Sequence, residues 1–192
     1  MANIVVIQGH PDKNGARFCR ALALAYTQGA IAAGHLVREV DVAELNFPLI
    51  KSEADFVSEV VPPDITLAQE AIHWANHLVI IYPLWLGTMP ALLKAVFEQI
   101  FRYGFGMARP NEGQGRLLKG RSARIIVTMG MPAIAYRWFF RAHSLKSLER
   151  NILWMCGIGP TRETLIGGSG LTVAKHREAW LEKVRKLGAR AK

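Results

Sequence analysis

Residues 82–94 read Tyr82-Pro83-Leu84-Trp85-Leu86-Gly87-Thr88-Met89-Pro90-Ala91-Leu92-Leu93-Lys94. The first of them closes the apolar run 77–82, which is typical of a buried strand. Pro83 ends that run and Pro90 begins a helical pattern, so a loop containing Trp85 lies between a strand and a helix. Open α/β sheets bind ligands beside the carboxyl ends of their strands. Because two prolines restrict the backbone of this loop, its aromatic surface suits a flat ring better than a phosphate group.

The same alternation of strand and helix patterns extends along the chain. We expect strands over residues 4–7, 35–41, 78–82, 124–128 and 161–166, and helices over 18–33, 64–75, 89–101, 144–155 and 173–187. Strands that alternate with helices form a parallel sheet covered on both faces. The pattern therefore predicts an α/β fold: a flavodoxin-like, doubly wound, five-stranded parallel sheet. We expect a single domain over residues 1–192, with connecting segments at 45–63 and a long surface excursion at 102–120.

Composition limits the class of protein. A hydrophobic fraction of 51% and a charged fraction of 20% indicate a globular chain. The most apolar window, 78–97, contains Pro83, Pro90 and Lys94, so we expect no membrane insertion and no leader before the first strand. Cys19 and Cys156 have neither a CxxC nor a metal-ligand spacing, which predicts reduced thiols, a cytoplasmic location and no metal site.

The formal net charge is +9, and basic residues gather in segments 102–124, 137–150 and 175–192. Such segments form either a solvated surface or a field that attracts anionic ligands such as nucleotide phosphates. No nucleic-acid-binding motif accompanies the charge, so we expect no nucleic-acid partner.

Three loops should meet at the ligand-binding edge of the sheet, at residues 10–18, 83–87 and 128–132. The first leads into a helix N-terminus, where Asn14, Gly15 and Arg17 either cradle a phosphate or form an ordinary turn. The sequence lacks GxGxxG and GxxxxGK[ST], which disfavours a Rossmann dinucleotide site and a P-loop. It also lacks HExxH and GxSxG, which disfavours metal-dependent and serine hydrolysis.

Tyr136 and His143 follow the fourth expected strand and are candidate catalytic residues. A phenol and an imidazole can donate hydrogen bonds to a reducible carbonyl or to an anion. The aromatic residues between them, at positions 138–140, allow another interpretation. They could form an amphipathic aromatic helix that packs on the sheet or on a second subunit.

Several of these motifs together resemble the NAD(P)H:quinone oxidoreductase family, which includes modulator-of-drug-activity reductases and the ancillary oxidoreductases of potassium efflux systems. The matching segments are Gly9-His10-Pro11, residues 18–22, residues 83–94, Gly104-Phe105, residues 119–121 and Thr128-Met129-Gly130. The similarity extends from Ile4 to about Ile166. Within it, Cys19 stands where an Asn is common and Gly87 where an aromatic residue often stacks.

The resemblance implies an NAD(P)H-dependent flavin oxidoreductase. Hydride would pass from NAD(P)H as co-substrate through bound FMN to a quinone or a similar small-molecule acceptor by a ping-pong mechanism. FAD is possible, but the chain lacks the C-terminal region that helps hold its adenosine half in longer relatives. The resemblance also implies a homodimer with its sites at the subunit interface. The alternative is a flavin-binding regulatory subunit that docks peripherally on a membrane transporter; a one-electron carrier is disfavoured by the charge of +9.

Site residues follow from the loops and from the resemblance. The cofactor-binding residues expected near the phosphates are His10, Arg17, Phe18 and Cys19; those expected along the flavin ring are Pro83, Leu84, Trp85, Leu86 and Gly87; those expected at its edge are Thr128, Met129 and Gly130. Tyr136 and His143 would lie beside the flavin and the quinone.

Overall fold

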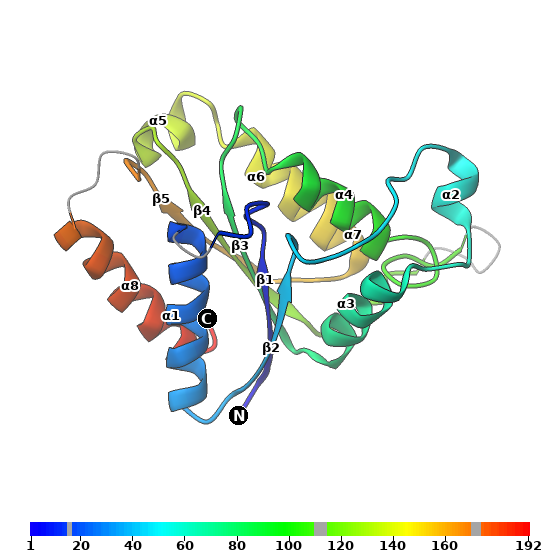
Figure 1. Cartoon of the computed structure of the whole chain (residues 1–192), viewed down its shortest axis with the longest axis horizontal. Coiled ribbons are helices and arrows are strands. Elements are labelled where there is room, and N and C mark those ends of the chain that lie inside the picture. Colours follow the sequence, from blue (N-terminus) through cyan, green and yellow to red (C-terminus); the bar gives the residue numbers. More distant parts are fainter. Residues whose placement is uncertain (15–16, 110–114, 170–173) are drawn as a thin grey trace.

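The computed structural model of the chain describes residues 1–14, 17–109, 115–169 and 174–192. Five strands form one parallel sheet in the order β2-β1-β3-β4-β5 (Figure 1). They are β1 (Asn3–Gln8), β2 (Leu36–Asp41), β3 (His77–Pro83), β4 (Ser122–Thr128) and β5 (Thr161–Ile166). The expected flavodoxin-like α/β fold is confirmed, and each strand lies within two residues of its expected bounds.

The helices cover both faces of the sheet (Figure 1). They are α1 (Phe18–Ala32), α2 (Glu53–Val57), α3 (Pro63–Trp74), α4 (Ala91–Ile100), α5 (Ala133–Trp138), α6 (His143–Ser147), the π-helical segment η2 (Leu148–Leu153), α7 (Trp154–Cys156) and α8 (Ala174–Ala189). On one face α1 and α8 pack together, and on the other lie α3, α4 and the continuous α6-η2-α7 helix (Figure 1). No described helix is long and apolar enough to cross a membrane.

The structure adds detail to two segments between the strands. Residues 45–63 contain the short helix α2, which begins with a capping box: the Asp55 N–H donates to the Ser52 hydroxyl, and the Asp55 carboxylate accepts from the Ser52 N–H. The excursion at 102–120 is anchored in its described part, because the buried Arg102 guanidinium donates to the carbonyls of Asp55 and Val60 at 2.9 and 2.7 Å. Residues 110–114 lie outside the described part of the chain.

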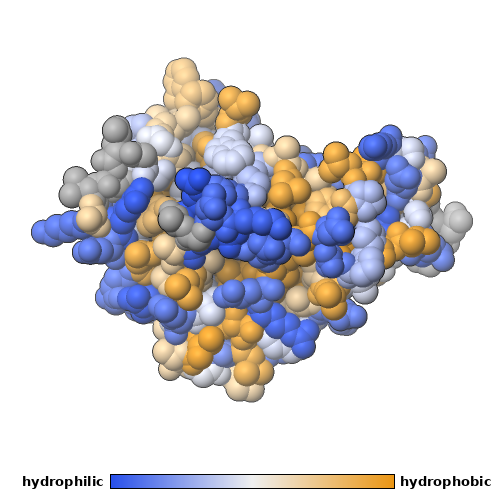
Figure 2. Space-filling model, viewed as in Figure 1, coloured by the Kyte–Doolittle hydropathy of each residue, from blue (hydrophilic) through white to orange (hydrophobic). Residues whose placement is uncertain are grey.

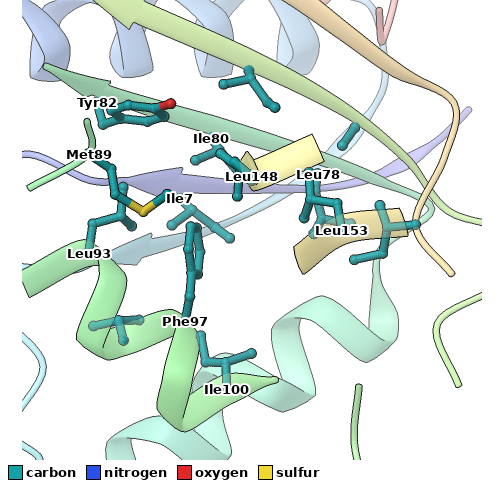
Figure 3. Packing of buried hydrophobic residues seen from close by; sticks show 14 of the residues in the cluster. Ile7, Leu78, Ile80, Tyr82, Met89, Leu93, Phe97, Ile100, Leu148 and Leu153 are labelled. Atoms are coloured by element: carbon teal, nitrogen blue, oxygen red, sulfur yellow. The ribbon is translucent and has the colours of Figure 1, made fainter. Parts of the chain in front are cut away.

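Two hydrophobic cores hold these layers together, one on each face of the sheet. The larger core joins strand residues such as Ile7 and Ile80 to Leu93 and Phe97 of α4 (Figure 3). All seven residues of β3 are buried, because this strand has a neighbouring strand on each side and helices over both faces. Each fully buried aliphatic side chain stabilises the fold by about 1.5–3 kcal/mol.

Glycines allow α1 and α8 to approach closely. A Cβ atom placed on Gly29 would lie 2.0 Å from the carbonyl oxygen of Arg185, and one on Gly188 would lie 2.1 Å from that of Tyr26. Since backbone atoms cannot yield as a flexible side chain does, any larger residue would force the helices apart.

Gly29→Ala should destabilise the protein by about 1–3 kcal/mol, measured as the free energy of unfolding in urea. The sign is diagnostic, because helix propensity alone would make the same change stabilising by about 1 kcal/mol. The control is Gln28→Ala at the neighbouring exposed position, which should change stability by less than about 0.5 kcal/mol. A stabilised Gly29→Ala variant would contradict the close helix contact.

His77 is a buried titratable residue at the start of β3, 4% exposed. Its Nδ1 lies 2.8 Å from the Ser122 hydroxyl, and its Nε2 has no partner among the described residues. Burial first, and then the positive charges of Arg124 and Arg162, lower the pKa of His77 from 6.5 to about 4. Folding therefore favours the neutral imidazole.

This shift predicts a loss of stability in mild acid. Between pH 6.5 and 4 the unfolded chain binds a proton at His77 that the folded chain does not, so the contribution of His77 to the unfolding free energy falls as pH falls through this window. The full loss is about 3 kcal/mol. His77→Asn should flatten this part of the stability profile measured by urea unfolding from pH 7 to 4, whereas His73→Asn, at an exposed position, should leave it unchanged. An equal slope in the wild type and His77→Asn would refute the assignment.

Candidate functional site

Backbone hydrogen bonds join the loops at the carboxyl edge of the sheet. The Leu84 N–H donates to the Thr128 carbonyl at 2.7 Å, and the Gly9 N–H donates to the Ile81 carbonyl at 2.7 Å. A larger residue at Gly9 would be crowded, because a Cβ atom there would lie 3.0 Å from the Tyr82 Cβ and 3.1 Å from the Ile81 carbonyl oxygen. The loops after β1, β3 and β4 therefore meet, as the strand pattern predicted.

The loop after β3 is a tight two-residue turn. The N–H groups of Trp85 and Thr88 each donate to the other residue's carbonyl, at 2.9 and 3.0 Å. The two residues between them, Leu86 and Gly87, have φ angles of 46° and 79°. Positive φ at both central positions matches the turn that joins antiparallel hairpin strands, and it strains Leu86. This turn, in addition to the two prolines, fixes the loop.

The turn exposes apolar side chains at the ligand edge. Trp85 is 46% exposed and Leu86 is fully exposed. The loop projects beyond the helices in Figure 1, and apolar surface remains at the same edge of the molecule in Figure 2. Pro83 is the last residue of β3 and is buried, and Leu84 is half-buried, so these two support the loop from below.

His10 connects the first loop to this turn. Its ring lies edge-on to the indole of Trp85, with 5.6 Å between centroids. Its Nδ1 accepts a hydrogen bond from the Asp12 N–H at 3.1 Å, which leaves the ring proton of the neutral form on Nε2. Burial, followed by the charge of Arg17, lowers the pKa of His10. In the neutral imidazole, Nε2–H is therefore a donor with no hydrogen-bond partner among the described residues, and it lies in the loop expected to hold the phosphate.

An internal ion pair lies at the expected anion site. The Asp12 carboxylate accepts from the Asn14 N–H at 2.9 Å and from the Arg17 Nε at 2.7 Å, and these contacts lower the pKa of Asp12. Helix α1 begins at Phe18 with no side-chain cap and no acidic residue in its first turn, so no side chain of that turn offsets the positive end of the helix dipole. Gly15, predicted to help cradle a phosphate, lies outside the described residues.

The structure places Cys19 and Thr128 beneath the loops. Both are buried, with 3.3 Å between the Cys19 Sγ and the Thr128 Oγ1. Burial raises the pKa of the Cys19 thiol to about 11, so it remains protonated and unreactive at neutral pH. This pair links the start of α1 to the end of β4. Met129 is also buried, whereas a Cβ on Gly130 would meet nothing within 4 Å. Of the edge residues Thr128, Met129 and Gly130, only the glycine leaves open space for a ligand.

The candidate catalytic residues lie in different environments. Tyr136, on α5, is 2% exposed; its hydroxyl lies 2.7 Å from the Ser144 hydroxyl and accepts from the Leu145 N–H at 3.2 Å. That phenol therefore joins α5 to α6 in this conformation, and direct contact with an acceptor would require it to leave these partners. His143 is exposed at the start of α6. The catalytic roles of both residues remain predictions.

Sequence reasoning missed the polar support of the first loop. The buried Gln8 at the end of β1 accepts from the His10 N–H at 2.5 Å and donates to the His10 carbonyl at 3.3 Å. The sequence contained one signal of this support, which was a polar glutamine at the end of an otherwise apolar strand. Arg20 donates to the Asp12 carbonyl at 3.2 Å and pairs with Asp41, a long-range contact that no sequence pattern shows.

Comparison with known proteins identifies the family. Residues 2–188 match the family model described as the flavodoxin-like fold. An uncharacterized NAD(P)H oxidoreductase of Haemophilus influenzae is 30% identical over 184 residues, covering 94% of this chain and 91% of that protein. The chain belongs to this flavodoxin-like family, and the resemblance to NAD(P)H oxidoreductases expected from the sequence is confirmed.

Solved structures agree in fold. An NAD(P)H:quinone oxidoreductase from Methanothermobacter marburgensis has a TM-score of 0.83 at 24% identity, covering 100% of this chain and 99% of the other. The protein Smu.1420 of Streptococcus mutans has a TM-score of 0.78 at 25% identity, covering 97% and 98%. An FMN-dependent NADH-azoreductase of Bacillus anthracis, solved with FMN, has a TM-score of 0.73 at 16% identity, covering 99% of each chain.

Proposed function

We propose that the protein is an NAD(P)H-dependent flavin oxidoreductase that binds FMN and reduces a quinone or a similar small molecule by a ping-pong mechanism. The observation that carries the proposal is the exposed surface of Trp85 and Leu86 beside the open backbone of Gly130, at the carboxyl edge of the sheet. The position corresponds to the switch in strand order at which flavodoxin-like folds bind ligands. Its relatives include proteins named as NAD(P)H oxidoreductases.

The residues at this edge fit a flavin mononucleotide. The Trp85 loop offers an apolar face of restricted conformation for a planar ring, and Gly130 lets the backbone approach the ring closely. The neutral His10 offers an N–H donor, and Arg17 and the N-terminus of α1 offer positive charge for a phosphate. A phosphate that reached Arg17 would compete with the carboxylate of Asp12.

Held by the Trp85 loop, His10 and Arg17, FMN would supply hydride transfer from NAD(P)H to the acceptor in two successive half-reactions. The protein's own part is to position the ring and to manage charge. His10 packs against Trp85 and limits the motion of the indole. His143, which is exposed, can donate a hydrogen bond to the oxygen of an acceptor as it gains negative charge. Tyr136 positions α6, and therefore His143, through Ser144.

We also propose that a homodimer completes the site. Near the ligand edge, the turn after α5 exposes Phe139 and Phe140, which are 81% and 48% exposed and whose rings pack edge to face. Contiguous apolar surface of this kind marks an interaction site. A second subunit over these residues would exclude water from the flavin edge. The transporter-docking alternative has less support, because the described part of the 102–120 segment packs against residues 55–60.

Trp85→Ala should weaken FMN binding by about tenfold or more, because the indole supplies stacking surface worth about 1–2 kcal/mol. The measurement is quenching of FMN fluorescence in a titration with the protein. The control is Trp154→Ala, which removes another half-exposed indole, on α7. Equal FMN affinity in the two variants would rule out the Trp85 surface as the flavin site, and an unfolding free energy unchanged in both would show that folding is not the cause.

A further inference from the structure

A separate groove lies at the β5 edge of the sheet. Its volume is about 510 Å³, within the range typical of small-molecule sites. The floor is β5, which pairs with β4 on one side and with no described strand on the other. The walls come from α5 and α8, with Ile134 and Trp138 on one side and Trp180 and Leu187 on the other. None of the residues predicted to contact the flavin lines this groove.

The groove presents indole rings from both walls. Trp138 is 74% exposed, although its α5 neighbour Tyr136 is buried in the core. Trp180 is held in place: its indole N–H donates to His176 Nε2 at 2.9 Å, and the ammonium of Lys183 lies 4.3 Å from its ring centroid. A fixed indole with a cation above it forms a pre-ordered aromatic surface. Such surface favours a planar aromatic ligand.

The charged residues that line the groove determine whether it favours an anionic or a cationic ligand. Three cations, Arg124, Arg137 and Lys183, line the groove with one carboxylate, Glu163. Arg137 pairs with Glu163, and Arg124 donates to the Thr164 hydroxyl and to the Lys192 carbonyl. Lys183 forms an ion pair with no carboxylate in the described part of the chain, and its ammonium lies over the indole of Trp180. Among the described residues that line the groove, Lys183 is therefore a cation available to pair with a ligand.

We infer that this groove is a second ligand site, which binds a planar aromatic anion such as an aromatic carboxylate, sulfonate or phosphate. The ring would lie between Trp138 and Trp180, and its anionic group would reach Lys183. A second copy of the chain fits this surface less well, because α8 carries five Lys and Arg residues against two Glu, so two copies would bring net positive charge together. The inference does not depend on the identity of the flavin or of the electron acceptor.

The test uses full-length protein saturated with FMN and the probe 8-anilinonaphthalene-1-sulfonate, followed by energy transfer from tryptophan to the bound probe. Lys183→Glu should weaken probe binding by about tenfold, because it replaces attraction by repulsion. Lys175→Glu makes the same change of charge on the same helix outside the groove and should alter binding less than about twofold. The uncharged analogue N-phenyl-1-naphthylamine should not distinguish these two variants.

Trp138→Ala provides an independent check, since it removes the opposite wall without a change of charge. It should weaken binding of the sulfonate probe by about fivefold or more, and it should leave the affinity for FMN unchanged. Equal probe affinity in Lys183→Glu and Lys175→Glu would overturn the inference. So would competition between the probe and FMN for the cofactor-free protein, because the probe would then occupy the flavin edge. Neither result would bear on whether FMN binds at Trp85, so failure here is separate from failure of the proposed function.

Discussion

The fold and the site both depend on the central position of β3. This strand is buried along its whole length and hydrogen-bonds to β1 on one side and to β4 on the other, in parallel register. Parallel pairing brings the carboxyl ends of these strands to one edge, where Pro83 lies opposite Thr128 and Gln8 opposite Ile81. The loops that follow these strands therefore lie next to one another. Trp85, His10 and Gly130 lie at the same edge of the sheet because of that register.

Much of this architecture could be predicted from the sequence, because it depends on local patterns. Buried parallel strands appear as short β-branched runs, and the residues 77–83 and 122–128 carry that signal clearly. The short helices α2 and α5 were harder to predict, since five or six residues contain too few turns for a periodic pattern. The capping box formed by Ser52 and Asp55 is a recognisable sequence signal for the start of a helix, but it does not show how long the helix is.

The details of the site depend on contacts between distant residues, which sequence patterns do not contain. The positions of the loops were predicted correctly. The contact between Cys19 and Thr128 was not, because the two residues are 109 positions apart in the sequence. The phenol of Tyr136 points into the core because Ser144 and Leu145 satisfy it there. Likewise, Leu86 adopts a positive φ angle only because Trp85 and Thr88 close the turn around it. A leucine carries no sequence signal for such a conformation.

The function proposed here requires that the carboxyl edge of this sheet holds a flavin that exchanges electrons with NAD(P)H. This requirement is tested by the visible absorption spectrum of the protein loaded with FMN and freed of excess cofactor, recorded without oxygen. We expect a protein-bound flavin spectrum that bleaches when NADPH or NADH is added and recovers when a quinone follows. A protein that retains no FMN would contradict the site itself. Bound FMN that neither nicotinamide cofactor can bleach would contradict the oxidoreductase function.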